Sequence, residues 1–318
     1  MVKLGRWPTP VDRALLPSGR TILVKRDDLS GFGRSGAKTR KLETFLGSIQ
    51  GDSHEEVVTS SGNASNLAHD LDLLQAKVGI RFRLFVSNHP KMSRRDRENM
   101  FDSIRVRKHF LGTRGRPIAA CMTAYRAYAA LCGRRILLTA PGLAVPASVV
   151  GAAKGYLEMH RQLADPPRAV FISAASGGTL AGLILAETLL CRLGKLPTAI
   201  IGVTVGWGLT RDTVHRLVRQ TETQLDLDQR SPPESVVLNG DQAHHGFGRF
   251  DAGLQQRCES FDRVPGLQLD PIYSGKTWAV MERCIDRSGP ARDDGAFLFW
   301  HCGYTPNWRQ FPRSSKAQ

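Results

Sequence analysis

The sequence has little cysteine, few aromatic residues and no long apolar run. Its six cysteines include no CxxC pair and no spacing typical of a zinc site or a disulfide framework. We therefore expect reduced thiols and no metal site. No stretch of about 18 apolar residues occurs, and the first residues form no apolar signal core. The sequence thus indicates neither a membrane span nor secretion, and we expect a cytoplasmic protein.

Acidic residues are also scarce relative to basic ones. The chain has 44 Lys and Arg residues against 29 Asp and Glu, which gives a formal net charge of +15. Such a charge attracts phosphates and polyanions, so nucleic-acid binding has to be considered. However, only 7% of the residues are aromatic, the basic residues are spread over the whole chain, and no nucleic-acid-binding signature is present. We therefore do not expect a nucleic-acid partner.

Short β-rich runs alternate with longer helical patterns along the chain. This alternation predicts an α/β fold with largely parallel sheets. The length of 318 residues predicts roughly two domains, at about 100–200 residues per domain. The predicted strands are 21–27, 56–60, 81–87, 134–140, 169–175, 199–206 and 296–302, and helices are predicted near 64–75, 94–105, 117–131, 148–164, 179–194, 211–224 and 275–288.

The segment "GAKTRKLE" holds three cations within four positions, namely Lys38, Arg40 and Lys41. Such a cluster is ordinarily a solvated helix face. The preceding loop is rich in glycine, which leaves its backbone free to approach a ligand. A lysine directly after such a loop is held in place, and a held lysine suits covalent chemistry. Lys38 is therefore a candidate catalytic residue.

A second informative segment is "ISAASGGTLAGL", in which a β-rich run leads through a Ser-Gly-Gly-Thr turn into a helix. Glycines let consecutive amide groups converge on a phosphate, and the positive end of the helix adds its field. A merely tight strand-to-helix turn is the alternative. The segment is neither a Walker A motif nor GxGxxG. The candidate phosphate-binding residues are Ser176, Gly177, Gly178 and Thr179.

A third segment, "VTSSGNASNLAHD", places a polar turn between a predicted strand and a predicted helix. The carboxyl ends of strands in α/β sheets are where ligands bind. Serine and asparagine also cap helices, but capping explains one residue of this turn and not six. The polar turn comprises Ser60, Ser61, Gly62, Asn63, Ser65 and Asn66.

A held lysine, a phosphate cradle and a polar Ser/Asn turn together meet the needs of pyridoxal 5′-phosphate. The chain resembles the fold-type II enzymes that use this cofactor, the tryptophan synthase beta superfamily. Within them it is most similar to the branch of 1-aminocyclopropane-1-carboxylate deaminase and D-cysteine desulfhydrase. The segments that carry the resemblance are, in chain order, "KRDDLSG", "GAKTRKLE", "SGNASN", "PGLAVPASVVGAAKGY", "SAASGGTLAGL", "LDPIYSGKTWAVM" and "FLFWHCGYTP".

The resemblance implies a two-domain fold in which each domain has a largely parallel sheet flanked by helices. We place the large cofactor-binding domain at 1–43 plus 149–318 and the small domain at 44–148. A symmetric homodimer is the expected default.

The resemblance also assigns roles to individual residues. Lys38 would form the Schiff base with the cofactor and would move the α-proton of the substrate, although Lys276 competes with it on chemistry alone. Asn66 would bond the phenolic oxygen of the cofactor, and Ser65 would lie close to the substrate. The phosphate would be held by Ser176, Gly177, Gly178 and Thr179.

Further roles concern the substrate carboxylate and the pyridine nitrogen. The turn "SSGN" is similar to the substrate-carboxylate loop of the cysteine synthases, so Ser61, Gly62 and Asn63 would bind the carboxylate of an amino acid. The segment "HCGYTP" would place Cys302 or Thr305 beside the pyridine nitrogen. A neutral partner leaves that nitrogen largely unprotonated, which favours prompt loss of a β-substituent.

Two departures from the family concern the substrate. At positions where deaminase relatives have active-site tyrosines, this chain is expected to present Phe247 and Phe299 to the substrate. Phenylalanine neither donates nor accepts a proton, so a tyrosine role is absent unless another group replaces it. Tyr304 is one alternative, and the pair His244 and His245 is another.

The expected activity is therefore that of a lyase or deaminase acting on a small amino acid. Removal of the α-proton by Lys38 would be followed by β-elimination, with release of a leaving group such as a thiol and then of ammonia and a 2-oxo acid. One alternative is a β-replacement synthase that makes a non-proteinogenic amino acid. A second alternative is a basic binding protein that keeps the fold without turnover.

Overall fold

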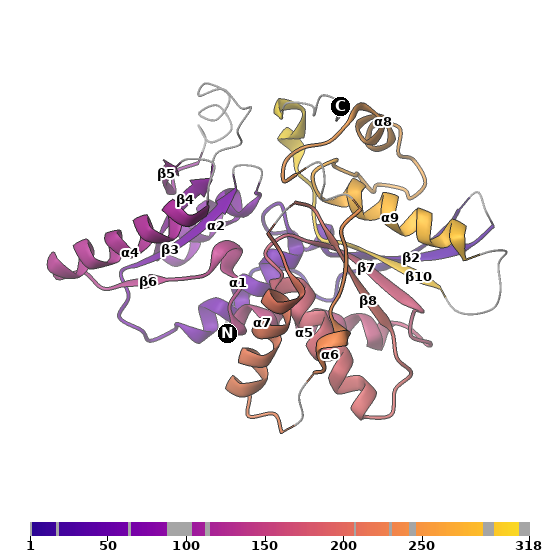
Figure 1. Cartoon of the computed structure of the whole chain (residues 1–318), viewed down its shortest axis with the longest axis horizontal. Coiled ribbons are helices and arrows are strands. Elements are labelled where there is room, and N and C mark those ends of the chain that lie inside the picture. The colour runs from indigo at the N-terminus through magenta and orange to yellow at the C-terminus, as the bar shows by residue number, and fades with distance from the viewer. Residues whose placement is uncertain are drawn as a thin grey trace.

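Two sheets form the framework of the chain (Figure 1). The computed structural model describes residues 2–16, 19–62, 65–87, 104–111, 115–206, 208–228, 231–241, 246–288 and 296–311. Within these residues, the larger sheet has six strands and the smaller sheet has four. The larger sheet has the order β1 (Val11–Leu15), β2 (Thr21–Arg26), β10 (Phe297–His301), β7 (Ala169–Ala174), β8 (Ala199–Thr204) and β9 (Val237–Asn239); the smaller has the order β5 (Arg107–Leu111), β4 (Arg81–Ser87), β3 (Glu56–Gly62) and β6 (Ile136–Leu138).

Among the described strands, the pair β1–β2 is antiparallel and the other pairs are parallel. Strands of a parallel sheet are covered on both faces and therefore read as continuous apolar runs. The central strand β10 has the sequence "FLFWH" and is buried along its whole length. The predicted α/β class with largely parallel sheets is confirmed. The predicted helix near 94–105 falls mostly outside the described residues.

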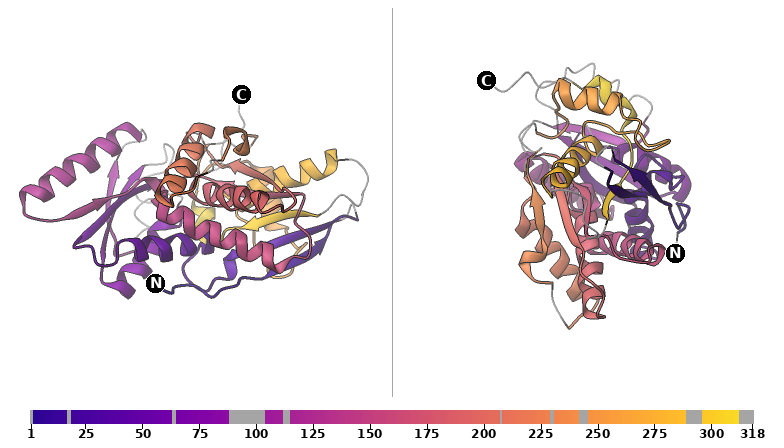
Figure 2. Two further views of the ribbon diagram at one scale, coloured as in Figure 1. Left: turned by 90° about the horizontal axis from the view of Figure 1, so that it is seen from below. Right: turned by 90° about the vertical axis from the view of Figure 1, so that its right-hand side faces the viewer.

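Helices cover both faces of the larger sheet (Figure 2). Side chains of β10 alternate between two apolar clusters: Phe299 packs in the cluster that includes helix α9, and Trp300 packs in the one that includes α5 and α6. The helices are α1 (Gly36–Ser48), α2 (Leu67–Val78), α4 (Gly115–Leu131), α5 (Pro146–Gln162), α6 (Gly178–Arg192), α7 (Arg211–Gln224), α8 (Ala252–Glu259) and α9 (Ser274–Arg287).

Helix α1 lies between the two sheets and packs against α5 and α2 (Figure 1). The strands of the larger sheet come from 11–26 and 169–301, whereas those of the smaller sheet come from 56–138. The domain boundaries given above remain a prediction. In the described ranges, no helix combines the length and the apolar character needed to cross a membrane.

Candidate active site

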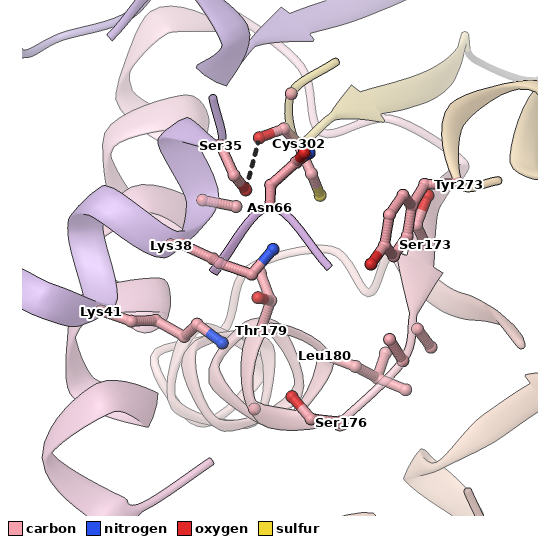
Figure 3. Close-up of a pocket in the computed structure, with 16 residues that line it drawn as sticks. Ser35, Lys38, Lys41, Asn66, Ser173, Ser176, Thr179, Leu180, Tyr273 and Cys302 are labelled. Carbon is pink, nitrogen blue, oxygen red and sulfur yellow. Dashed lines mark hydrogen bonds between the residues drawn. The ribbon is translucent and has the colours of Figure 1, made fainter. Parts of the chain in front are cut away.

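The loops after several parallel strands converge on two adjoining pockets beside the start of α1. Figure 3 shows the first of them. Both pockets are lined by Lys38, Ala175, Ser176 and Tyr273. This is the crevice at the carboxyl ends of the strands where α/β proteins bind ligands. The first pocket adds Ser35, Ala37, Lys41, Asn66, Ser173, Ala174, Gly177, Gly178, Thr179, Leu180, Cys302 and Gly303; the second, a cavity of about 280 Å³, adds Ser61, Gly62, Ser65, Ser87, Pro141, Gly142, Val205, Gly206 and Phe247.

Lys38 is placed by the tight start of α1. The helix begins at Gly36, and a Cβ atom there would collide with the carbonyl oxygen of Asp27, so the close approach requires glycine. The amide of Ala37 donates to the carbonyl oxygen of Cys302 at 3.3 Å, which ties the helix start to the end of β10. Lys38 thereby directs its amino group into the pocket, 5.7 Å from the ring centre of Tyr273 (Figure 3).

The other two cations of the cluster are buried and serve different purposes. Arg40 pairs with Asp27 at 2.9 Å and with Glu158 on α5 at 2.7 Å, so it fixes α1 to α5 and to the turn after β2. Lys41 lies one turn after Lys38 and reaches the first pocket, where its Nζ donates to the carbonyl oxygen of Gly142 at 3.4 Å. The interpretation of this cluster as a solvated face is wrong for Arg40 and Lys41, which are both buried.

The start of α6 forms an anion cradle. Gly177 caps the helix with a left-handed φ of 84°, a conformation that suits glycine, and Gly178 opens it. The first N–H groups of a helix have no intrahelical acceptor, and the helix dipole favours an anion there. A Cβ atom at Gly178 would lie 3.5 Å from Nζ of Lys41, so the ammonium group faces the cradle. The four predicted phosphate-binding residues, 176–179, all line the first pocket.

Asn66 and Cys302 line the first pocket, as predicted for cofactor contacts. The amide of Asn66 donates to Oγ1 of Thr305 at 3.0 Å, which fixes its side chain. Thr305 is buried and lines neither pocket, whereas Cys302, the other predicted neighbour of the pyridine nitrogen, lines the first pocket. Burial raises the pKa of the Cys302 thiol to about 12, and the group is therefore neutral near pH 7.

The second pocket collects the predicted substrate-binding residues Ser61, Gly62, Ser65 and Phe247. The Oγ atom of Ser61 is buried and has no hydrogen-bond partner among the described residues. An orphaned hydroxyl at the edge of a pocket is available to a ligand. Three further candidates, Asn63, His244 and His245, lie outside the described residues.

Phe299 does not lie where the sequence predicted. Its side chain is fully buried on β10 and packs edge-on against Trp278 at a centroid distance of 5.1 Å. It lines neither pocket, because the alternation of β10 directs it into the core beneath α9. The prediction that Phe299 contacts the substrate is therefore wrong, and its replacement of a tyrosine says nothing about catalysis.

Tyr273 is the main residue that the prediction missed. It lines both pockets, and its hydroxyl forms a hydrogen bond with Ser65. Burial raises the pKa of Tyr273 well above its usual value, so the hydroxyl stays protonated. Asp270 holds the turn that presents it, because its Oδ1 accepts the amide of Tyr273 at 2.8 Å. A tyrosine hydroxyl is thus present, and the segment "LDPIYSGK" was the signal for it.

Tyr304 does not supply that hydroxyl. It lines neither of the two pockets, and its hydroxyl oxygen accepts a hydrogen bond from the indole of Trp308 at 3.2 Å. Lys276 is also away from the pockets: its Nζ is buried and donates to the carbonyl oxygens of Val205 and Gly246. Geometry therefore favours Lys38 over Lys276 as the lysine that reacts.

The comparison with known protein families decides the cofactor. A family model described as "Pyridoxal-phosphate dependent enzyme" matches residues 2–303. The chain belongs to this family. Its cofactor is therefore pyridoxal 5′-phosphate, as the sequence predicted. The residues present fit that cofactor. The ammonium of Lys41, the first N–H groups of α6 and the hydroxyls of Ser176 and Thr179 surround the phosphate cradle, and Lys38 points into the same pocket.

Individual relatives agree with the family. D-cysteine desulfhydrases of Serratia proteamaculans and Yersinia enterocolitica are 25% and 26% identical, each over 91% of this chain and 88% of the relative. Among solved structures, one described as an ACC deaminase homologue has a TM-score of 0.78 at 23% identity and covers 95% of this chain and 91% of its own. A threonine deaminase structure has a TM-score of 0.61 at 15% identity, with coverage of 94% and 92%. These structures confirm the fold.

Lys41 makes the cradle sensitive to pH. Burial and the neighbouring Lys38 lower the pKa of Lys41 to about 7 in the protein chain alone. We expect Lys41→Met to weaken binding of pyridoxamine 5′-phosphate by about 10- to 100-fold at pH 7, because a charge-assisted hydrogen bond is lost. Between about pH 7 and 9 the wild-type affinity should fall as the ammonium loses its proton, while the variant shows a shallower slope. Fluorescence titration measures both.

The control for Lys41 is Lys195→Met, which removes an exposed ammonium just after α6. It changes the net charge by the same amount and should leave the affinity unchanged. Pyridoxamine 5′-phosphate has no aldehyde, so the titration does not depend on bond formation with Lys38. Equal affinities of the wild type and Lys41→Met at pH 7 would show that Lys41 does not contact the phosphate.

Proposed function

We propose that the protein catalyses β-elimination from a small amino acid that carries a leaving group on its β-carbon, in the manner of a D-cysteine desulfhydrase. The observation that carries this proposal is the juxtaposition, in one pair of pockets, of Lys38, the phosphate cradle and the hydroxyl pair of Tyr273 and Ser65. The names of two relatives, both D-cysteine desulfhydrases, support the same class of reaction. A small amino acid is the corresponding substrate.

In this proposal the cofactor, when bound, supplies the electron sink that stabilises the negative charge left on the α-carbon. Lys41, the start of α6, Ser176 and Thr179 hold its phosphate, and Asn66 bonds its phenolic oxygen. Lys38 bonds the cofactor and takes the α-proton. Cys302, whose raised pKa keeps the thiol neutral, would lie beside the pyridine nitrogen and would give it no proton, which favours loss of a β-substituent over transamination.

Elimination breaks the bond between the β-carbon and the leaving group, and the electron pair departs with the leaving group. A group that leaves as an anion benefits from a proton donor close by. The protonated hydroxyl of Tyr273, bonded to Ser65, is that donor in our proposal. Ser61 and Gly62, which line the second pocket, would bind the substrate carboxylate together with the predicted Asn63, which lies outside the described residues. The enamine that is released then hydrolyses in water to ammonia and a 2-oxo acid.

The test is an assay of the protein, loaded with cofactor, against D-cysteine, L-cysteine, O-acetylserine and aminocyclopropane carboxylate. We expect equimolar ammonia and 2-oxo acid from at least one of these, with sulfide if the substrate is cysteine. The control is Lys38→Ala under the same conditions. Turnover of aminocyclopropane carboxylate alone would assign ring opening instead. Cofactor binding with no turnover of any compound would contradict elimination.

β-Replacement shares the first half of this reaction, and the cavity of about 280 Å³ beside Lys38 offers room for a second nucleophile. Repeating the assay with an added thiol separates the two reactions. A lyase gives the 2-oxo acid regardless of the addition, whereas a synthase converts the same substrate into a new amino acid.

We also propose that the protein is a homodimer and that it is cytoplasmic. Sedimentation analysis tests the oligomeric state.

A further inference from the structure

A third cavity, of about 250 Å³, shares no lining residue with the first pocket, which is called the cofactor pocket below. Two chain segments separate the two spaces. In the first segment, Gly33 and Arg34 face the third cavity, and Ser35 and Ala37 face the cofactor pocket. In the second segment, His301 and Tyr304 face the third cavity, whereas Cys302 and Gly303 between them face the cofactor pocket.

The lining of this third cavity is polar. Charged or hydrogen-bonding side chains come from Asp28, Arg34, Gln268, His301 and Tyr304, and the remaining lining residues are glycine and proline. Among the described residues, Pro306 contributes the one aliphatic side chain. Such a cavity suits a small polar ligand and not a hydrocarbon.

Arg34 is the unusual group in this cavity. Its side chain is half-buried. The buried arginines Arg26 and Arg40 are both paired: Arg26 lies 2.8 Å from both Asp12 and Asp28, and Arg40 contacts two carboxylates as described above. In the described part of the chain, no side chain forms an ion pair or hydrogen bond with the guanidinium of Arg34. Burial lowers the pKa of Arg34, and the carboxyl group of Asp70 opposes this only in part.

Asp70 gives Arg34 little compensation. Its Oδ1 accepts the main-chain amide of Arg34 at 2.7 Å, not the guanidinium. Burial also raises the pKa of Asp70 to about 7, so the carboxyl group carries only part of a negative charge near neutrality. A half-buried cation without a full counter-charge costs free energy that a bound anion would recover.

Two more groups of the cavity have unused hydrogen-bonding capacity. The hydroxyl of Tyr304 accepts from Trp308, so its own proton is available to donate. The Nε2 atom of His301 lies 2.8 Å from the carbonyl oxygen of Gln268 and therefore carries a hydrogen. The Nδ1 atom of His301 is buried, has no hydrogen bond among the described residues and lies 3.5 Å from Asp28.

We propose that this cavity is a second ligand site, for a small monocarboxylate whose carboxylate pairs with Arg34 and accepts a hydrogen bond from Tyr304. A planar guanidinium matches a carboxylate in two parallel hydrogen bonds. Asp28 also lines the cavity and repels a dianion such as phosphate more than a monoanion. The carboxylate comes either from an amino acid, whose ammonium group then lies near Asp28, or from a 2-oxo acid.

A ligand here would act on the segment that places the catalytic lysine. The carbonyl oxygen of Arg34 accepts the amide of Tyr304 at 3.1 Å, and three residues later Ala37 bonds the carbonyl of Cys302. Movement of Arg34 toward a bound carboxylate is therefore transmitted to the start of α1 and to the residue beside the pyridine nitrogen. This site does not depend on which reaction the enzyme performs.

The test is calorimetric titration of the Lys38→Ala protein with acetate, glycine, pyruvate and inorganic phosphate, after saturation with pyridoxine 5′-phosphate. This analogue fills the phosphate cradle and has neither an aldehyde nor an amine, so it forms no imine with glycine or pyruvate. We expect saturable binding of at least one carboxylate. Arg34→Gln should weaken it by about 10- to 100-fold and Tyr304→Phe by about 2- to 10-fold. Arg211→Gln, at the exposed start of α7, is the matched control and should bind as before. Ser61→Ala, which alters the substrate pocket, should also leave this binding unchanged.

Each outcome has one meaning. Tightest binding of glycine assigns the site to an amino acid, and tightest binding of pyruvate assigns it to a 2-oxo acid. The inference is overturned if no carboxylate saturates, if phosphate binds more tightly than every carboxylate, or if folded Arg34→Gln and Tyr304→Phe proteins both bind like the wild type. Because the titration uses a protein without the Schiff-base lysine, failure of the proposed reaction does not affect the result.

Discussion

Replacing Lys38 with alanine is expected to reduce turnover by at least about 10³-fold and to remove the visible absorbance of covalently bound cofactor. Lys38 stands at the shared wall of the two pockets, where its amino group meets both the cradle at α6 and the substrate side near Tyr273. Among the described residues, the other lysine of these pockets is Lys41, which is directed to the phosphate cradle. Absorbance spectra and the elimination assay measure the two effects.

The matched control for Lys38 is Lys276→Met. Lys276 is buried, and burial lowers its pKa to about 7, a value that would also suit a reactive lysine. However, its Nζ is used by two backbone carbonyl oxygens at 2.9 and 3.1 Å, away from the pockets. Lys276→Met should keep the absorbance band and lose thermal stability, because two buried acceptors lose their donor. A band that survives in Lys38→Ala but disappears in Lys276→Met would reverse the assignment.

Features that depend on neighbouring residues were predictable from the sequence. The cradle at 176–179 requires a strand, two glycines and a helix in succession, and one short segment of the sequence, from β7 to α6, contains all three. The buried strands β7 and β10 read as unbroken apolar runs because helices cover both their faces. The polar segment at the end of β3 was also visible in the sequence, and Ser61, Gly62 and Ser65 line the second pocket.

Features that depend on distant partners were not predictable. Arg40 and Lys41 are adjacent in the sequence, yet one pairs with Glu158 and the other reaches the cradle, because successive helical residues point about 100° apart. Only the packing of α1 against α5 decides which cation meets a carboxylate. Thr305 likewise fixes Asn66, a contact between residues 239 positions apart.

Phe299 and Tyr273 show the same limit at the substrate side. A residue in a fully buried strand faces one of two apolar layers, and its sequence neighbours are apolar in either case. The strand sequence "FLFWH" therefore does not show which layer receives Phe299. The ring of Tyr273 meets Phe247 at 5.7 Å and its hydroxyl meets Ser65, across loops from three different parts of the chain.

Tyr273→Phe is the second change with a large expected effect. It should lower kcat by about 10²- to 10⁴-fold while KM and the cofactor absorbance change little. The ring, which packs against Phe247, is retained, and only the hydroxyl paired with Ser65 is lost. Steady-state kinetics with the best substrate of the elimination assay measures the split between kcat and KM.

The control for Tyr273 is Tyr156→Phe, which removes another buried hydroxyl, one that donates to Glu187 at 2.6 Å and lies outside both pockets. It should cost stability and leave kcat unchanged. Because burial raises the pKa of Tyr273, the hydroxyl remains protonated through alkaline pH, and the wild-type rate should show no alkaline loss from this group. A kcat of Tyr273→Phe within threefold of the wild type would exclude the hydroxyl as the proton donor and leave Ser65 or solvent to protonate the leaving group.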